Sequence, residues 1–290
     1  MSSSLPPWWL VFSKELRELW IGGKALTLIL LYTVLLGLYA YLLATNTELK
    51  LMPLREMVLE MVKASIAVSL FISLVIGADS VSGERERATL EGLLLTPASR
   101  RQIIVGKFLA AVSPWPVALA IAVPYWNAVS QGDEVFGRAA LWGSLLGSLL
   151  APALAGLGML VSIWCNTNKT SMVVSLGLYL LLLIPTRPSG PAQISYGLRM
   201  AANAVEWANP VAASSRFLSQ VLVKNWSGTE FWFWLTMPVL VAVLVPVVLF
   251  VHASPAVRLE VETASRFRPY WGRVVGLWTR AVGVPAKSPS

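Results

Sequence analysis

The chain of 290 residues is poor in the side chains that most often bind metals or carry catalysis. It has one cysteine, Cys165, and one histidine, His252. A lone cysteine leaves no internal disulfide and no cysteine-based metal site, and a lone histidine leaves no site built from a histidine pair. We therefore predict that the chain holds no metal ion and has little capacity for histidine-based catalysis.

The sequence also lacks a loop that could bind nucleotide phosphates. The nearest candidate ends in Gly106-Lys107, but Arg101 stands where the first glycine is required and Phe108 follows in place of serine or threonine. No Gly-x-Ser-x-Gly motif is present either. The chain by itself is therefore predicted to have no catalytic residues, to be no enzyme, and to bind no cofactor.

Charged residues are the third scarcity, at 13% of the sequence, whereas 56% is hydrophobic and the mean hydropathy is +0.65. Ordinary soluble domains have roughly 25% charged residues. A run of about 20 apolar residues crosses a hydrocarbon core of about 30 Å. The sequence predicts an all-α polytopic membrane protein with six membrane-spanning helices, at 25–43, 61–78, 108–129, 139–164, 172–185 and 231–252.

Within these predicted spans, charged side chains are nearly missing. Carriers coupled to protons or sodium usually bury ionisable groups at mid-membrane, whereas Asp79 stands only at the edge of the second span. The absence indicates that energy for any transport enters from outside the bilayer.

The positive charges alternate between the connections. Lysine and arginine number 15 on the side that holds both ends of the chain and 8 on the other. Because cytoplasmic loops carry the excess, both termini are predicted to be cytoplasmic in a multi-pass protein of the cell membrane. The net charge of +8 suits an anionic lipid surface rather than nucleic acid, because no basic stripe with interleaved aromatics stands apart from the spans.

The region before the first span, 1–24, is predicted to form an amphipathic helix lying on the membrane. Apolar residues recur at three- and four-residue steps between Pro6 and Trp20, and charged residues fall between them. The basic tail, 253–290, is predicted to carry a second surface-lying helix. Between spans five and six, segment 186–230 is too long and apolar for a plain loop. Helical spacing at 194–205 and 212–223, interrupted by Asn209-Pro210, predicts short helices dipping into the outer leaflet.

The fourth predicted span carries small residues at four-residue steps. These are Gly143, Gly147, Ala151 and Ala155. Small residues on one ridge allow helix backbones to approach closely in a membrane, so we assign these four to helix packing.

The charged segment 79–107, between the second and third predicted spans, carries the most information. Its pattern of Glu84, Glu86, Ala88-Thr89, Leu90-Glu91, Leu93-Leu94, Pro97, Ser99-Arg100 and Gly106-Lys107 resembles the cytoplasmic loop of ABC-2 type permeases. These are membrane subunits of ATP-binding-cassette exporters. The family usually has glycine before the threonine, where this chain has Ala88.

The residues alone predict a helix from Glu84 to Leu95, with Leu90, Leu93 and Leu94 on one face and Glu84, Arg85 and Glu91 on the other. Thr96-Pro97 should end this helix, and Ser99 with Gln102 should form the capping box of the next one. The resemblance implies that the first helix is a coupling helix docking on a cytoplasmic ATPase. The residues predicted to contact that partner are Glu84, Arg85, Glu86, Arg87, Thr89 and Glu91.

The resemblance further implies the permease subunit of an ATP-driven exporter. It would form the translocation path with a second permease subunit, a copy of itself or a homologue, and with separate cytoplasmic ABC ATPase subunits that hold ATP and Mg²⁺. The connecting helix before the first span and re-entrant outer helices between spans five and six are implied as well. Two alternatives stay open: a nucleotide-independent channel or carrier whose cytoplasmic loop binds a regulator, and a membrane-embedded enzyme. The cargo is not indicated.

Overall fold

The computed structural model describes residues 6–46, 51–87, 98–184, 196–224 and 231–256. Within these ranges the regular structure is entirely α-helical. The helices are α1 (Pro7–Ile21), α2 (Lys24–Thr45), α3 (Leu54–Asp79), α4 (Ser82–Glu86), α6 (Arg100–Val112), α7 (Pro114–Ser130), α8 (Val135–Trp164), α9 (Asn168–Leu183), α10 (Tyr196–Ala208), α11 (Pro210–Leu222) and α12 (Phe231–Ala256). The predicted tail at 253–290 falls almost entirely outside the described residues.

Five helical stretches in the described part are long and apolar enough to cross a membrane. They are Lys24–Thr45, Leu54–Glu86, Arg100–Ser130, Val135–Trp164 and Trp232–Val251. At the place of the fifth predicted span, α9 has 16 residues. At about 1.5 Å per residue it is about 24 Å long, which is shorter than a hydrocarbon core of about 30 Å. The structure thus shows an all-helical membrane protein with five candidate spans.

The second predicted span begins too late. The helix α3 starts at Leu54 rather than at 61, and its first turns carry Arg55, Glu56, Glu60 and Lys63. Lys63 bonds Glu60 one turn before it, at 2.8 Å. Such pairs keep charged residues compatible with a helix, so the loss of hydropathy before residue 61 does not mark a helix end.

Prolines divide the third predicted span into two helices. The helix α6 ends at Val112, and Pro114 begins α7 after a single residue, Ser113. Proline is favourable at a helix start because the backbone N–H that it lacks would have no acceptor within the helix there. The same rule separates α10 from α11, where Asn209 accepts hydrogen bonds from the first N–H groups of α11 and Pro210 begins the helix.

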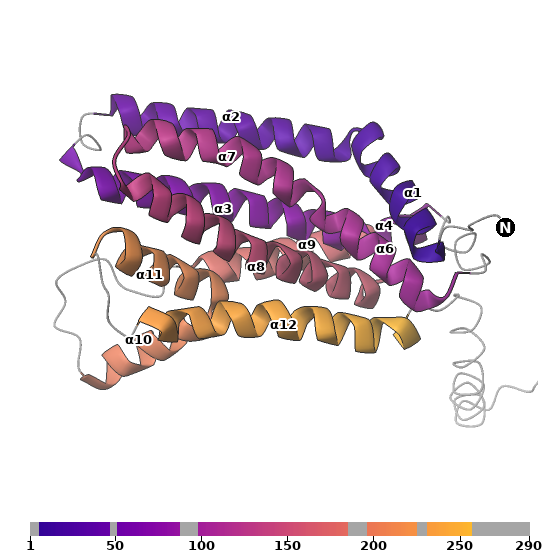
Figure 1. The fold of residues 1–290 in the computed structure, drawn as a ribbon. Helices are drawn as coiled ribbons and strands as arrows, with labels where there is room; N and C mark the ends of the chain where they lie inside the picture. The colour runs from indigo at the N-terminus through magenta and orange to yellow at the C-terminus, as the bar shows by residue number, and fades with distance from the viewer. Residues whose placement is uncertain (1–5, 47–50, 88–97, 185–195, 225–230, 257–290) are drawn as a thin grey trace, which may run out of the picture.

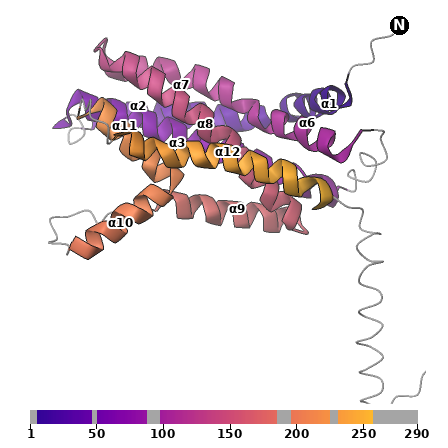
Figure 2. The same cartoon turned by 60° about the horizontal axis from the view of Figure 1, so that its bottom comes forward.

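The bundle is built around α3 and α8, which make the most extensive contact of any two helices in the described part. Figure 1 shows the long helices running side by side, with α1 and α6 at one end and α10 and α11 at the other. Within its most apolar window α8 is 78% buried, whereas α2 is 22% and α12 is 17% buried. The outer helices therefore leave apolar surface for lipid or a protein partner, and α10 projects from the bundle in Figure 2.

The four small residues assigned to packing all lie buried in α8. A methyl group on Gly143 would come 3.0 Å from Val62, and one on Gly147 would overlap the ring of Trp115. Ala151 and Ala155 are completely covered. Neighbouring side chains thus occupy the space that larger residues on this ridge would need.

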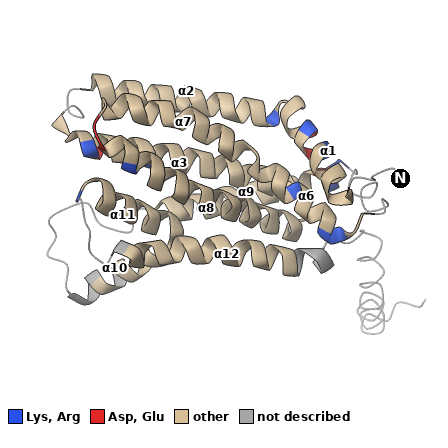
Figure 3. Ribbon diagram, viewed as in Figure 1, with Lys and Arg blue, Asp and Glu red and all other residues tan. Residues whose placement is uncertain are grey.

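Charged residues gather at the two ends of the bundle, and the middle is nearly free of them (Figure 3). The end formed by α1, α4 and α6 is called the α1 end below, and the end formed by α10 and α11 is called the α11 end. The charged segment that the sequence singles out lies at the α1 end.

Candidate functional site

The predicted coupling helix is described only in its first part. After α3 the chain turns at Ser80-Val81 and forms α4, and the described residues stop at Arg87. Residues 88–97 lie outside the described part, and they include Thr89 and Glu91. The predicted capping box is confirmed: the Ser99 side chain accepts from the Gln102 N–H, and the Gln102 side chain accepts from the Ser99 N–H.

Glu84 does not lie on an exposed face, and that part of the prediction is wrong. Its exposed fraction is 7%, and Ser82 and Gly83 beside it are also buried. The carboxylate points into a group of charged side chains from α1 and α6, so helical periodicity within segment 84–95 could not reveal its neighbours. The α1 helix packs closely against α6 and encloses Glu84 between them.

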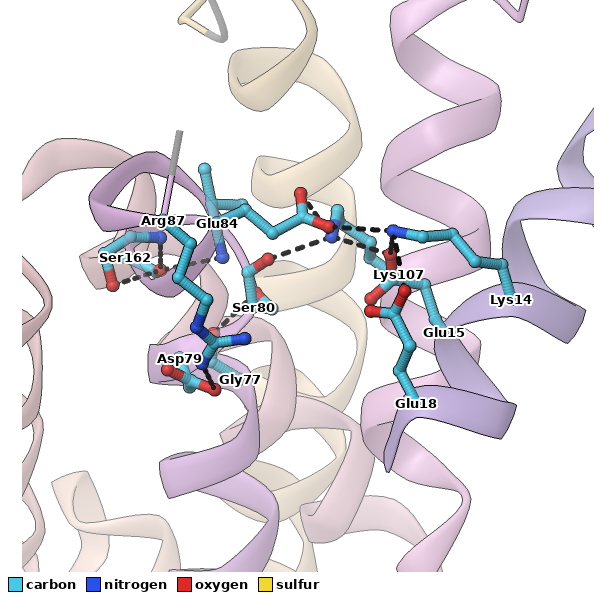
Figure 4. Close-up of polar contacts among 12 residues, drawn as sticks. Lys14, Glu15, Glu18, Gly77, Asp79, Ser80, Glu84, Arg87, Lys107 and Ser162 are labelled. Carbon is cyan, nitrogen blue, oxygen red and sulfur yellow. Dashed lines mark hydrogen bonds and ion pairs between the residues drawn. The ribbon is translucent and has the colours of Figure 1, made fainter. Parts of the chain in front are cut away.

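Lys107 is the centre of this group. It directly precedes the third predicted span, and it is not among the predicted contact residues. Its side chain is 1% exposed. The ammonium lies 2.8 Å from Glu84 Oε2 and 3.0 Å from Glu15 Oε1, and it donates to the carbonyl of Ser80 at 3.0 Å. Figure 4 shows these side chains converging from α1, α4 and α6. All three ammonium protons can thus be used, as burial of a charge requires.

Lys14 extends the network toward the surface. Its ammonium lies 3.3 Å from carboxylate oxygens of Glu15, Glu18 and Glu84. Burial of the Lys14 ammonium opposes its charge, but the three carboxylates outweigh burial and raise its pKa above the ordinary value. For Glu15, burial disfavours the charged carboxylate and raises its pKa, and the Lys107 ammonium offsets only part of that rise. Lys14 and Lys107 thus join α1 to the charged segment through their ion pairs with Glu15 and Glu84.

A second group surrounds Asp79 at the end of α3. Its carboxylate bonds to Lys24 at the start of α2, and it lies 3.6 Å from Arg87. Asn168, at the start of α9, donates to the other oxygen at 2.8 Å. A methyl group on Gly83 would come 2.3 Å from that oxygen. Asp79 therefore holds α2, α9 and the segment after α4 together, and a larger residue at position 83 would displace its carboxylate.

Ser162 of α8 fixes the turn between α3 and α4. Its hydroxyl accepts from the N–H groups of Val81 at 3.1 Å and Ser82 at 2.8 Å, and it donates to the Ser82 hydroxyl at 3.0 Å. These groups are buried, so no water can replace a lost acceptor.

Replacing Ser162 with alanine is expected to lower the free energy of unfolding by about 1–3 kcal/mol, because two buried donors would lose their acceptor. Chemical unfolding of the purified protein in mixed micelles measures the change. Ser144→Ala is the matched control on the same helix, since within the described residues the Ser144 hydroxyl bonds only carbonyls of its own helix, Ala140 and Leu141. Equal losses in both variants would show that Ser162 does not hold this turn.

The other described contact residues differ in how far their side chains are exposed. Arg85 is half-buried, and its guanidinium donates to the Cys165 carbonyl at 2.6 Å. Glu86 is exposed, and the Arg87 side chain is 53% exposed. Of the six predicted contact residues, Glu86 and Arg87 are the two whose described side chains face outward.

A pocket of about 650 Å³ lies between α1, α2, α3, α6 and α9, beside both charged groups. Oxygens of Glu15, Glu18 and Glu84 lie within 4.8 Å of one another beside it. The ammonium groups of Lys14 and Lys107 already contact these oxygens. Two ammonium groups thus lie among these three carboxylates, and their ion pairs join α1, α4 and α6.

Comparison with known proteins identifies the family. A family model described as "ABC-2 family transporter protein" matches residues 9–262, which is most of the chain. The chain belongs to the ABC-2 transporter family. The resemblance found in the charged segment is thereby confirmed, and the match begins within α1.

Individual relatives match over shorter stretches. The chain is 25% identical over 155 residues to the "Probable multidrug ABC transporter permease YbhR" of Escherichia coli K12, which covers 53% of this chain and 40% of YbhR. It is 41% identical over 66 residues to the "ABC transporter permease protein NatB" of Bacillus subtilis 168, covering 21% of this chain and 17% of NatB. The aligned part is thus less than half the length of either relative.

Proposed function

We propose that this chain is the permease subunit of an ATP-driven exporter, moved by separate cytoplasmic ABC ATPase subunits that hold ATP and Mg²⁺. The observation that carries the proposal is that α4, the described start of the predicted coupling helix, is firmly attached to the bundle. Ion pairs to α1 and α6 and hydrogen bonds to α8 and α9 hold it, and those to Lys107 and Ser162 are buried. A displacement of this segment by a partner would therefore be passed to several helices at once, and membership of a permease family supports such a partner.

In this proposal both termini and α4 are cytoplasmic, α1 lies on the inner surface among anionic lipids, and α9 serves as a sixth, short span. The α10–α11 pair enters the outer leaflet. A second permease subunit, identical or homologous, covers part of the exposed apolar surface of α2, α9 and α12. Because its carboxylate is buried, Glu84 transmits force inside the protein instead of contacting the ATPase. Glu86 and Arg87 contact the ATPase.

Reversing the two outward charges, with Glu86→Lys and Arg87→Glu together, is expected to weaken association with the ATPase about tenfold. A hydrogen bond to a charged group is worth about 1.5–3 kcal/mol, and 1.4 kcal/mol corresponds to about tenfold in affinity. The measurement is the permease concentration that half-maximally stimulates ATP hydrolysis by the ABC ATPase encoded with this chain, in reconstituted liposomes.

Lys224→Glu supplies the matched control, because Lys224 is an exposed cation at the α11 end. Unchanged stimulation by the double variant, at normal expression, would contradict contact through Glu86 and Arg87. Flux through the chain in liposomes without nucleotide or ATPase would instead support the channel alternative and contradict an ATP-driven permease.

A further inference from the structure

The pocket of about 650 Å³ between α1, α2, α3, α6 and α9 has the size of a ligand site, since such sites commonly measure about 300–1,000 Å³. Its lining comes from segments that are far apart in the sequence, at 15–28, 75–87, 107–111 and 168–172. The pocket therefore forms only when the bundle is folded, and residues that are neighbours in the sequence give no sign of it.

The lining of this pocket changes from polar to apolar along the bundle. The helices α2 and α9 begin at the α1 end, α3 ends there, and the hydrogen bonds from Ser171 and Tyr179 hold α9 alongside α3 (Figure 1). On each of these helices a polar lining residue lies four residues, or about 6 Å, nearer to the α1 end than an apolar one. The three pairs are Lys24 and Leu28 on α2, Asp79 and Val75 on α3, and Asn168 and Met172 on α9. The pocket thus has a polar mouth at the α1 end and an apolar part nearer the middle of the bundle.

Cations outnumber carboxylates on the Asp79 side of the mouth. Lys24 and Arg87 both line the pocket, and both contact the same carboxylate, that of Asp79. Their side chains are 45% and 53% exposed. A lysine ammonium has three N–H donors and an arginine guanidinium has five. Both cations therefore keep donors for the anionic group of a ligand while they remain beside Asp79.

Carboxylates outnumber cations on the α1 side of the mouth. The three carboxylates of α1 and α4 share two ammonium groups, those of Lys14 and Lys107. Glu18 lines the pocket and its side chain is 57% exposed, so it can accept further hydrogen bonds while it stays paired with Lys14. The Lys107 ammonium joins the two sides, because it contacts these carboxylates and also donates to the carbonyl of Ser80, the residue after Asp79 (Figure 4).

We propose that this pocket binds a phospholipid whose head carries both a phosphate and a primary ammonium group. The phosphate lies beside Lys24 and Arg87, and the ammonium lies beside Glu15 and Glu18. A head with both charges matches the two sides of the mouth, whereas a head with one charge leaves one side unmatched. The first part of an acyl chain fills the apolar part of the pocket beside Leu28.

The rest of the lipid continues into the bilayer beside α2, which is only 22% buried in its most apolar window. The inference rests on the proposed position of α1 at the membrane surface. It requires neither nucleotide nor an ATPase, so its failure and the failure of the proposed coupling role can be told apart.

The test uses the full-length chain in dodecyl maltoside micelles, immobilised on scintillation beads, with tritiated lauroyl lysophosphatidylethanolamine as the probe. Saturable binding is expected. Three amphiphiles of the same chain length should each compete about 10-fold more weakly, because each loses charge-assisted contacts. Lysophosphatidylcholine has an ammonium without protons to donate, lysophosphatidic acid has no ammonium, and dodecylamine has no phosphate.

Two single variants should change the affinities in a crossed pattern. Glu18→Gln is expected to weaken the probe about 10-fold and to leave lysophosphatidic acid unchanged, because only the probe carries an ammonium group. Arg87→Gln is expected to weaken both phosphate ligands about 10-fold and to leave dodecylamine unchanged. Both side chains are more than half exposed, so neither change should unfold the protein, and a structural defect would weaken every ligand alike.

The matched control is Lys224→Gln, which removes an exposed cation at the α11 end and should bind all four ligands as the unaltered chain does. Two-chain phosphatidylethanolamine should displace the probe, and a probe that it does not displace would overturn a membrane lipid as the occupant. Absence of saturable binding, equal competition by all the amphiphiles, or equal losses for every ligand in both variants would overturn the site itself.

Discussion

Lys107→Met is expected to lower the free energy of unfolding by about 3–5 kcal/mol, because removing one partner of a buried ion pair leaves the other charge uncompensated. The Lys107 side chain is 1% exposed, and the facing side chains of Glu84 and Glu15 are 9% and 15% exposed. Methionine keeps the apolar volume of the lysine chain and removes only the ammonium. The loss therefore reports on charge rather than on a cavity.

Reversible unfolding in mixed micelles, followed by a probe on α6, measures this effect. Lys14→Met is the matched control in the same network. Its side chain is 43% exposed, so solvent screens it and the expected loss is about 1 kcal/mol or less. Adding Glu15→Gln and Glu84→Gln to Lys107→Met should restore much of the stability, because the uncompensated charges are then gone and the sites are coupled.

A loss below about 1 kcal/mol in Lys107→Met would contradict the central position of Lys107. The triple variant, Lys107→Met with Glu15→Gln and Glu84→Gln, also tests transmission through the network. A protein that folds normally with Glu15, Glu84 and Lys107 all neutral, yet no longer stimulates its ATPase, would place force transfer in the ion pairs rather than in helix packing.

The helices could largely be predicted from the sequence because local rules determine them. The amphipathic spacing between residues 6 and 20 corresponds to α1 (Pro7–Ile21), and the prolines at 114 and 210 begin α7 and α11. The capping box at Ser99 depends on a side chain three residues away. These signals act within one or two helical turns, and tertiary contacts did not override them.

The interior of the candidate site could not be predicted, because it depends on which helices meet. The pattern of its own segment predicts an exposed Glu84, but α1 lies over it, and its partner Lys14 is 70 residues away in the sequence. Lys107 was visible only as the last residue of a family pattern.

Gly158→Ala and Gly77→Ala should both destabilise the protein, although glycine to alanine in a helix normally stabilises it by up to about 1 kcal/mol. A methyl group on Gly158 would stand 2.2 Å from the carbonyl oxygen of Leu74, and one on Gly77 would stand 2.2 Å from that of Ala155. Both contacts are with backbone, which cannot rotate away as a side chain can. The helices α3 and α8 would have to separate.

Overpacking of this kind typically costs about 1–3 kcal/mol, and separating the two central helices should place the effect at the upper end for each variant. The double variant is expected to yield little folded protein. Gly137→Ala is the control on α8 itself, since nothing lies within 4 Å of its added methyl group, and it should be neutral or stabilising. Thermal unfolding of the three single variants in the same detergent compares the signs directly. Stabilisation by Gly158→Ala equal to that of Gly137→Ala would show that α3 and α8 do not meet backbone to backbone.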